Sequence, residues 1–466
     1  MEGETHVPWY PSALDFDALH RDYPPPPDYF RTTRVISRDE LRAKQEARFA
    51  KTIERGWEIP FFQRHWKNAG IAPGDIRGLD DLARIPPYTV FDIRDSIARA
   101  PPFGDFMGLS PADGKRMPLV FHTSGGTTGT PRPMLYSPQD RQVMGILGGR
   151  RFAMAGVKPG DLVMITYAAG LWNGAIAIRE QIWGYTGAIP IVTAAGNVTP
   201  TRRQIELAKL WGVNVIAGMP AFLRHMANVA RDELNLDPRS LGIKVLCTHL
   251  GAEDRASLEE LWGARAFDAY GTSESGMLAA ECSHQTGMHI QEDAFVLEIV
   301  DPETGTPLPP GAKGTTYITT LYKYGAPQIR FNVNDISAIA PGTCPCGSTL
   351  QRLERIYGRN DNMVKLRGIN VFPEAVGALA ASDARTTGEY FCIVERVDSD
   401  RDEMRVLVEV RDAGIDRASL RDDLERRLQE ALGVRIIVEP AGRGELDSYT
   451  GTSQVTKVKR LLDKRS

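Results

Sequence analysis

Between residues 118 and 247, short apolar runs alternate with helical segments, and this alternation limits the possible folds more than any other feature. The strand-like runs span residues 119–121, 162–166, 189–192, 213–216 and 244–247. Segments with helical periodicity, such as 203–211 and 220–231, lie between these runs. Strands that alternate with helices form β-α-β units, in which the strands run parallel in one sheet. The sequence therefore predicts an α/β fold with a mostly parallel sheet.

The chain is too long for one hydrophobic core, and its pattern changes near residue 358. A single core stops growing at roughly 250–300 residues, and the chain has 466. Beyond the change, strand-like runs occur at 391–395, 404–410 and 435–438. One charged amphipathic helix is expected at 417–432. We predict a large N-terminal domain, residues 1–358, and a small α+β C-terminal domain, residues 359–466.

Within the large domain, about residues 1–115 are predicted to form a helical lead-in. Residues 38–66 are expected to be helical, because Phe49, Ile53 and Trp57 recur at spacings of four and so share one face. Further along, residues 295–300 and 314–320 are rich in β-formers. The large domain is therefore expected to contain β-structure beyond its parallel sheet.

Bulk composition excludes several classes of protein. The formal net charge is -3, so the chain has no general attraction for polyanions, and we expect neither nucleic acid nor a membrane as partner. The longest apolar runs fall short of the roughly 20 residues of a spanning helix, and residues 1–23 lack the basic start and apolar core of a secretory signal. Five cysteines argue against a disulfide framework. We expect a cytoplasmic protein with reduced thiols or a metal site.

The strongest motif follows the first strand-like run, at residues 121–132, with the sequence FHTSGGTTGTPR. Its glycines let backbone N–H groups turn toward an anion, and its hydroxyls add donors, so such a loop can hold a polyphosphate. No G-K-[ST] follows, which excludes a Walker loop. The candidate phosphate-binding residues are Ser124, Gly125, Gly126, Thr127, Thr128 and Gly129. Taken alone, a loop of this kind is more often an ordinary turn.

The order Ser-x-Gly-Thr-Thr-Gly-x-Pro resembles the phosphate loop of adenylate-forming enzymes, the superfamily of acyl-CoA ligases, luciferases and peptide-synthetase adenylation domains. Other segments match that superfamily in the same order along the chain. The resemblance implies an adenine loop at Gly251, Ala252 and Glu253, an adenine-stacking segment at Tyr270, Gly271 and Thr272, a ribose-binding Asp335 and a nearby Arg359. It also implies that Glu274 helps to hold Mg²⁺, a role that suits a carboxylate beside phosphate groups.

The C-terminal domain carries the remaining expected groups. Residues 358–368 resemble the family's hinge, with Asp361 as pivot, and Lys365 and Gly368 are expected on the side that meets the acceptor. Lys457 occupies the place of the catalytic lysine, which would neutralise charge at the α-phosphate together with Glu274 and Thr127. Lys459 is the alternative. In this superfamily the small domain is mobile and rotates about the hinge between the two half-reactions.

A narrower resemblance, to phenylacetate-CoA ligases, rests on three segments. Residues 74–93, with the text GDIRGLDDLARIPPYTVFDI, residues 367–373 and His122 before the phosphate loop are typical of that family. The expected acyl pocket includes Tyr167, Gly170 and Trp172, although these aromatic residues are equally compatible with the core.

Several positions depart from the family pattern. Thr130 and Arg132 stand where lysines are usual, and Asp254 replaces a common proline. Residues 331–334, FNVN, replace Tyr-Arg-Thr-Gly. No group that adenylation requires is lost. The changes do weaken what the resemblance implies about the second half-reaction and about the identity of the acid.

A metal site is suggested by Cys282, His289, Cys344 and Cys346. Three thiolates and one imidazole suit tetrahedral Zn²⁺, and a complete set of four protein ligands makes the site structural. His284 is a possible substitute ligand, and free buried cysteines are the alternative interpretation. The other two cysteines, Cys247 and Cys392, lie in apolar runs and are expected in the core.

The resemblance implies ATP-dependent activation of a small, aromatic carboxylic acid to an acyl-AMP, followed by transfer to coenzyme A. A carrier-protein thiol is an alternative acceptor, and related enzymes of secondary metabolism adenylate nitrite for diazotisation of an arylamine. A regulatory module that binds ATP without turnover is the alternative outside enzymes. Homodimers are common among the enzymes that this sequence resembles, so a homodimer stays open.

Overall fold

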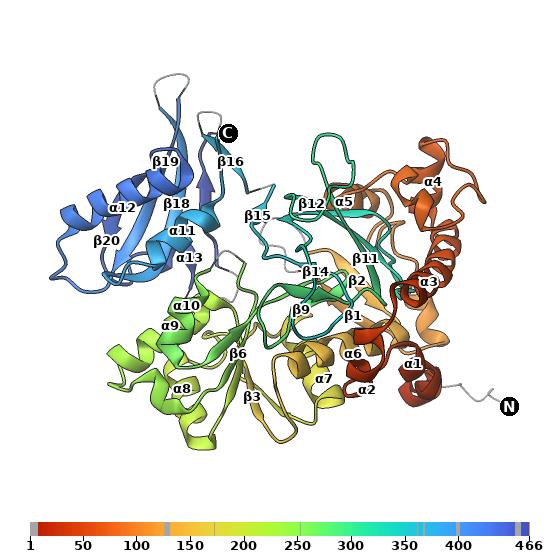
Figure 1. Ribbon diagram of the computed structural model, residues 1–466, viewed down its shortest axis with the longest axis horizontal. Helices are drawn as coiled ribbons and strands as arrows, with labels where there is room; N and C mark the ends of the chain where they lie inside the picture. The colour runs from red at the N-terminus through yellow and green to blue at the C-terminus, as the bar shows by residue number, and fades with distance from the viewer. Residues whose placement is uncertain are drawn as a thin grey trace. The chain divides into compact units, whose positions relative to one another are not determined.

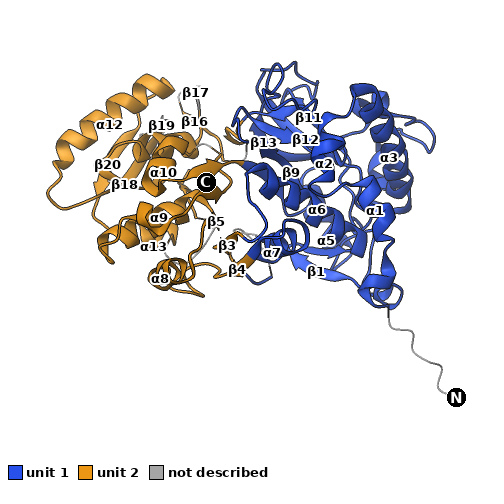
Figure 2. Ribbon diagram, turned by 60° about the horizontal axis from the view of Figure 1, so that its bottom comes forward, with its two compact units in different colours: residues 1–160, 169–189, 269–354 blue, residues 161–168, 190–268, 355–466 orange. Residues whose placement is uncertain are grey.

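The computed structural model describes residues 8–124, 131–171, 173–251, 253–360, 362–366, 369–397, 401–452 and 458–465. The chain divides into two compact units (Figure 2). Unit 1 comprises residues 1–160, 169–189 and 269–354, and unit 2 comprises residues 161–168, 190–268 and 355–466. Unit 2 thus joins the C-terminal segment to part of the middle of the chain, and the domain division at residue 358 stays a prediction.

Unit 1 begins with a helical lead-in (Figure 1). The α-helices of unit 1 are α1 (Phe16–Asp22), α2 (Asp28–Arg31), α3 (Arg38–Glu58), α4 (Pro60–Asn68), α5 (Val90–Arg99), α6 (Pro138–Met154) and α7 (Gly174–Tyr185). The first five belong to the lead-in. Short 3₁₀ helices cover Tyr10–Ala13, Thr33–Val35, Leu79–Arg84 and Pro111–Lys115. The helical structure expected at residues 38–66 is confirmed, with one break at Ile59, after which α4 restarts with Pro60 at its first turn. Proline has no N–H for the helical ladder and fits only the first turn.

The β-structure of unit 1 is antiparallel. Its strands are β1 (Val120–Thr123), β2 (Pro133–Tyr136), β8 (Ala269–Thr272), β9 (Gly276–Glu281), β10 (Met288–Ile290), β11 (Phe295–Val300), β12 (Gly314–Thr320), β13 (Phe331–Ser337) and β14 (Arg352–Leu353). One sheet has the order β14-β10-β9-β8, and β11, β12 and β13 are neighbours in another. Strand β1 pairs antiparallel with β2. The expectation that this first strand belongs to the parallel sheet is therefore wrong.

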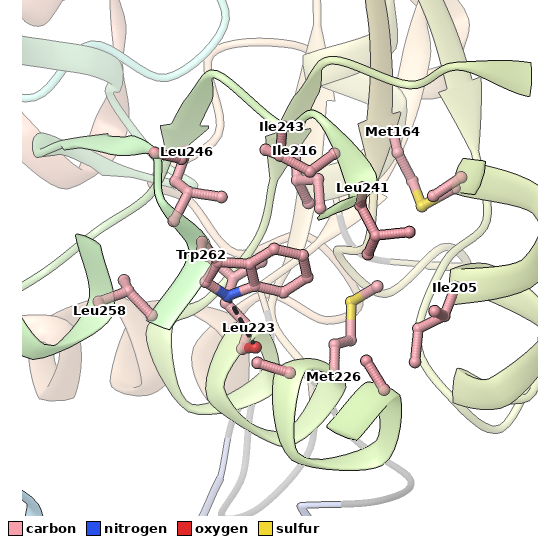
Figure 3. Close-up of a cluster of buried hydrophobic side chains, with 14 of the residues drawn as sticks. Met164, Ile205, Ile216, Leu223, Met226, Leu241, Ile243, Leu246, Leu258 and Trp262 are labelled. Carbon is pink, nitrogen blue, oxygen red and sulfur yellow. Dashed lines mark hydrogen bonds between the residues drawn. The ribbon is translucent and has the colours of Figure 1, made fainter. Parts of the chain in front are cut away.

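Unit 2 contains the predicted parallel sheet, with the strand order β4-β3-β5-β6-β7. Its elements are β3 (Leu162–Ile165), β4 (Ile189–Val192), α8 (Thr201–Trp211), β5 (Val215–Ala217), α9 (Pro220–Asp232), the 3₁₀ helix Pro238–Leu241, β6 (Val245–Cys247), α10 (Arg255–Trp262) and β7 (Arg265–Phe267). The sheet residues Met164, Ile216 and Leu246 form an apolar cluster with side chains of α8, α9 and α10 (Figure 3). Within it, the Trp262 indole N–H donates to the Leu223 carbonyl at 3.2 Å.

The C-terminal part of unit 2 is a small α+β structure. Its elements are β15 (Gly358–Arg359), β16 (Val364–Leu366), β17 (Ile369–Val371), α11 (Pro373–Ala381), β18 (Thr386–Val397), β19 (Arg401–Val410), α12 (Arg417–Leu432), β20 (Ile437–Ala441), α13 (Asp447–Thr450) and β21 (Leu461–Asp463). The mixed sheet has the order β20-β19-β18-β21, and α11 and α12 bury their apolar side chains in its core. The α/β class with a smaller α+β part is confirmed. Among the described helices, none is both long and apolar enough to cross a bilayer.

Candidate functional site

The phosphate-loop segment starts and ends on the β1–β2 hairpin of unit 1. Thr123 pairs with Pro133, the first residue of β2. The N–H of Ser124 donates to the Arg132 carbonyl at 3.0 Å, and the N–H of Arg132 donates to the Ser124 hydroxyl oxygen at 3.2 Å. These bonds fix the two ends of the segment. Its glycines and threonines, residues 125–130, lie outside the described residues.

The expected adenine-stacking segment forms β8 and the turn into β9. Gly271 is required there, because an added Cβ would lie 2.6 Å from the Gly276 carbonyl oxygen. The Thr272 hydroxyl accepts from the N–H of Ser275 at 3.0 Å and so stabilises the turn that carries Glu274. The local chain thus holds Tyr270 on the strand and Glu274 on the following turn.

The expected adenine and ribose residues meet in unit 1, although they are 65 positions apart in the chain. The Tyr270 hydroxyl donates to Asp335 Oδ2 at 2.5 Å. Asp335 lies on β13, directly after Asn334, which has φ of 62°. Asparagine tolerates this left-handed conformation better than most residues with a Cβ. Asn334, which stands where the family has glycine, can therefore adopt the left-handed backbone conformation that precedes Asp335.

The carboxylate of Glu274 forms an ion pair with Arg132, and both side chains are mostly buried. This pairing joins the expected Mg²⁺ ligand to the end of the phosphate-loop segment. It gives a physical role to Arg132, one of the departures from the family pattern, because a guanidinium can hold either a carboxylate or a phosphate.

Sequence reasoning missed a buried lysine next to Glu274. The ammonium of Lys323 donates to the Glu274 backbone carbonyl and lies 4.6 Å from the ring centroid of Tyr136. Burial lowers the pKa of Lys323 to about 8, although the Asp140 and Glu274 carboxylates oppose the change. The Tyr136 hydroxyl donates to the Ser273 carbonyl at 2.8 Å. The sequence signal that could have indicated this residue was a lone lysine shortly after the buried β-run at 314–320.

His122, on β1, is also buried. Burial, and then the Arg141 guanidinium, lower the pKa of its imidazole. The ring is therefore neutral at ordinary pH.

Unit 2 contains the segment expected to form the adenine loop. Gly251 adopts φ of 57°, a left-handed conformation that favours glycine. Glu253 lies 3.4 Å from Arg224, and Asp254 caps α10 by accepting from two backbone N–H groups. Aspartate thus starts the helix at the position where the family has a proline. Ala252 lies outside the described residues.

The remaining predicted residues are only partly described. Tyr167 is buried in unit 2, with its ring centroid 6.0 Å from that of His249. Gly170, in unit 1, has φ of 144°. Arg359 lies on β15, and Lys365 is exposed on β16. The expected Trp172, Asp361, Gly368 and Lys457 lie outside the described residues, as does Thr127.

The four predicted zinc ligands come together in unit 1, with their ligand atoms all within 4.8 Å of one another. Cys282 follows β9, His289 lies on β10, and Cys344 and Cys346 lie in the loop before β14. The Sγ atoms of Cys282 and Cys344 are 3.7 Å apart, and Cys346 Sγ lies 3.4 Å from His289 Nε2. A tetrahedral zinc with Zn–S bonds of about 2.3 Å separates two sulfurs by about 3.8 Å. His284 is not part of this set.

The surroundings of the cluster also suit a metal. Burial lowers the pKa of His289 to about 4, which keeps its imidazole neutral. The Thr286 hydroxyl lies 3.4 Å from Cys344 Sγ, and Arg34 donates to the Cys346 carbonyl. None of the five cysteines forms a disulfide. Cys247 and Cys392 are fully buried, as expected for core residues.

Comparison with known proteins identifies the family. The chain is 31% identical over 459 residues to phenylacetate-coenzyme A ligase of Thermus thermophilus, with 92% of this chain and 98% of the relative covered. It is 30% identical over 449 residues to the Escherichia coli enzyme of the same name, with 93% and 97% covered. The chain belongs to the phenylacetate-coenzyme A ligase family. Residues 368–465 of this family member also match the model of the AMP-binding enzyme C-terminal domain.

Solved structures agree with that assignment. The crystal structure of 2-hydroxyisobutyryl-CoA ligase in the postadenylation state is 26% identical to this family member, with a TM-score of 0.84, and the match covers 93% of this chain and 91% of the other. The same ligase in complex with 2-HIB-AMP and CoA in the thioesterification state matches with 27% identity and a TM-score of 0.66, and the same shares of both chains are covered.

Proposed function

We propose that this protein is a ligase that uses ATP to activate a small carboxylic acid as its acyl-AMP and then transfers the acyl group to coenzyme A. The hydrogen bond between Tyr270 and Asp335 carries the proposal. It brings together two residues for which the family resemblance implies adenine and ribose contacts, in a chain whose relatives are named as coenzyme A ligases.

In this proposal the described residues of unit 1 bind and orient ATP. The Tyr270 ring supplies a flat apolar face for adenine, and Asp335 accepts from the ribose hydroxyls. Glu274 would hold Mg²⁺ together with phosphate oxygens, a shared set of ligands that suits this ion. Bound Mg²⁺ neutralises phosphate charge. When Glu274 takes that role, Arg132 becomes available to the phosphates.

The first reaction is attack of the substrate carboxylate on the α-phosphorus of ATP, with pyrophosphate as the leaving group. Lys457 and the phosphate-loop donors stabilise the charge that develops on the phosphate. The thiol of coenzyme A then attacks the acyl carbon of the acyl-AMP, and AMP leaves. The mixed anhydride is needed because a carboxylate alone offers no leaving group to a thiol.

We further propose that Cys282, His289, Cys344 and Cys346 hold a structural zinc ion. The 3.7 Å between the Sγ atoms of Cys282 and Cys344 matches the separation that a tetrahedral zinc imposes, and all four ligand atoms lie within 4.8 Å of one another. Four protein ligands complete the coordination shell, so the ion would tie the loop before β14 to the β9–β10 turn without taking part in the reaction.

Pyrophosphate exchange tests the proposal directly. Purified protein, ATP and Mg²⁺ are incubated with labelled pyrophosphate and one acid at a time from phenylacetate, hydroxy- and aminobenzoates, cinnamates and 2-hydroxyisobutyrate. We expect acid-dependent label in ATP and, after addition of coenzyme A, an acyl-CoA detectable by mass spectrometry. Absence of exchange with every acid contradicts adenylation. If exchange occurs but the acyl product forms only on a carrier protein, the proposed transfer to coenzyme A is contradicted and adenylation is not. The same holds if AMP forms only with nitrite and an arylamine.

A further inference from the structure

Three buried side chains donate to three consecutive backbone carbonyls in the turn between β8 and β9. The bonds join the Tyr136 hydroxyl to the Ser273 carbonyl at 2.8 Å, the Lys323 ammonium to the Glu274 carbonyl, and the Tyr322 hydroxyl to the Ser275 carbonyl at 2.7 Å. One donor ends β2, and the other two follow β12. The turn that carries the Glu274 carboxylate is therefore held by two separate parts of unit 1.

All three donors are shielded from water. Tyr136 is 0% exposed, Tyr322 4% and Lys323 5%. A lysine is almost never buried to this degree unless it is paired, and a buried donor that loses its acceptor costs free energy. The Lys323 ammonium also lies 4.6 Å from the ring centroid of Tyr136, whose face attracts a cation. These contacts are therefore a fixed part of the fold.

The carboxylate of Asp140, which is fully buried, fixes the segment that contains Lys323. Its Oδ1 accepts from the N–H of Tyr324 at 2.7 Å, and its Oδ2 accepts from the N–H of Gly325 at 3.1 Å. The same Oδ2 accepts from the N–H of Ser137 at 2.9 Å, in the capping box that begins α6. Its negative charge also attracts the ammonium of Lys323, so the buried cation is compensated.

The backbone and the side chain of Glu274 are held in different ways. Its carbonyl belongs to the fixed turn, whereas its carboxylate pairs with the Arg132 guanidinium. A side chain can change its ion-pair partner by rotation of its own torsions, without movement of the backbone. In the proposed function, Mg²⁺ at the ATP phosphates takes the place of Arg132. The turn must keep its position during this exchange if the carboxylate is to meet the metal.

We propose that Lys323, together with Tyr136 and Tyr322, is a positioning residue that holds the turn so that the Glu274 carboxylate meets Mg²⁺ at the ATP phosphates. This inference rests on the proposed function and on the assignment of Glu274. The physical basis is the strict geometry of Mg²⁺, which binds oxygen ligands at about 2.0–2.1 Å in a nearly ideal octahedron. A ligand on a loose turn must be ordered when the metal binds, and this ordering lowers the affinity.

The charge of Lys323 by itself would have a different effect from its hydrogen bond. A cation attracts phosphate, and metal-free ATP carries more negative charge than ATP with bound Mg²⁺. If attraction were the only role of the ammonium, its loss should weaken binding of metal-free ATP at least as much as binding of Mg-ATP. Loss of a positioning contact should weaken binding of Mg-ATP alone, because metal-free ATP does not use the Glu274 carboxylate.

Calorimetric titration of ATP without acid, once with Mg²⁺ and once with EDTA, provides the test at pH 7. We expect Lys323→Met to weaken Mg-ATP binding about tenfold, the lower end of the usual effect when a partner of a metal ligand is lost. Tyr136→Phe and Tyr322→Phe, which each lose one hydroxyl, should weaken it about 3- to 5-fold. Binding of ATP in EDTA should stay within about twofold of wild type in all three variants.

Two controls match these changes in kind. Tyr23 is a buried tyrosine whose hydroxyl donates to the Leu321 carbonyl at 3.3 Å, outside the turn. Tyr23→Phe therefore removes a bond of the same type and should change Mg-ATP binding by less than about twofold. Lys51→Met removes an exposed lysine on α3 of the same unit and should leave the binding unchanged.

A second comparison asks whether Lys323 acts through Glu274. In a Glu274→Gln background, Lys323→Met should cause no additional loss of Mg-ATP affinity, because the carboxylate that it positions is already gone. In pyrophosphate exchange with the wild-type carboxylate, the Mg²⁺ concentration that gives half the maximal rate should rise about tenfold in Lys323→Met. KM for the acid should stay within about twofold.

The outcomes distinguish this inference from the proposed function. Wild-type protein without acid-dependent exchange contradicts adenylation, and the inference fails with it. Active wild-type protein overturns the inference alone if Lys323→Met weakens ATP binding equally in EDTA, if its loss persists in full in the Glu274→Gln background, or if Glu274→Gln itself leaves Mg-ATP binding unchanged. If Lys323→Met does not fold, Tyr136→Phe and Tyr322→Phe against Tyr23→Phe decide the question, and equal Mg-ATP affinities in these three variants overturn the inference.

Discussion

Replacement of Cys344 by serine is expected to remove zinc and destabilise unit 1. Cys282 and Cys344 are 62 positions apart in the chain, with their Sγ atoms 3.7 Å apart. A cross-link that closes a loop of about that length lowers the entropy of the unfolded chain by an amount worth about 4 kcal/mol. A bound zinc that links the same residues acts in the same way, in addition to its own bond energies. We therefore expect a loss of at least about 4 kcal/mol in the free energy of unfolding.

The assay combines metal content with thermal unfolding. Protein purified without added metal should contain about one zinc per chain by elemental analysis, and Cys344→Ser should contain almost none. For a unit of more than 200 residues, 1 kcal/mol shifts Tm by roughly 2 °C, so Tm should fall by about 8 °C or more. Incubation of the wild type with a strong chelator should produce a similar decrease.

A control keeps the comparison specific to the metal cluster. Cys247 is a buried thiol on β6, outside the cluster. Cys247→Ala should retain one zinc per chain even if its packing is somewhat weaker. Zinc near zero in the wild type, or a chelator that leaves Tm unchanged, would refute the reasoning, since the thiols would then be ordinary buried cysteines.

Two predictions concern the nucleotide site. Tyr270→Phe keeps the aromatic face but loses the hydrogen bond to Asp335, and a hydrogen bond to a carboxylate is worth about 1.5–3 kcal/mol. KM for ATP should therefore rise about tenfold or more, with a smaller change in kcat. An unchanged KM would contradict the role of this contact. Burial lowers the pKa of Lys323 from its ordinary value of 10.5 to about 8, so between these values the unfolded chain binds this proton and the folded chain does not. The free energy of unfolding of the wild type, measured in urea, should therefore rise relative to Lys323→Met between pH 8 and pH 10, by up to about 3 kcal/mol, and parallel pH profiles would contradict the assignment.

The sequence by itself determined the elements whose signal is local. The amphipathic helix expected at 417–432 is α12, and the β-runs expected at 295–300 and 314–320 are β11 and β12. Four of the five strand-like runs that alternate with helices form neighbouring strands of one sheet in unit 2. These signals depend on residue spacing within one element, which the sequence contains directly. The order of the motifs also predicted the family.

Only the tertiary structure decided which distant residues meet. The sequence contains four metal-binding residue types, but their approach to within 4.8 Å depends on the pairing of strands far apart in the chain. The ion pair of Arg132 with Glu274 and the buried ammonium of Lys323 left no periodic signal. Such contacts arise when whole elements pack, because the free energy of burial depends on the shape of the complete core and not on the order of neighbouring residues.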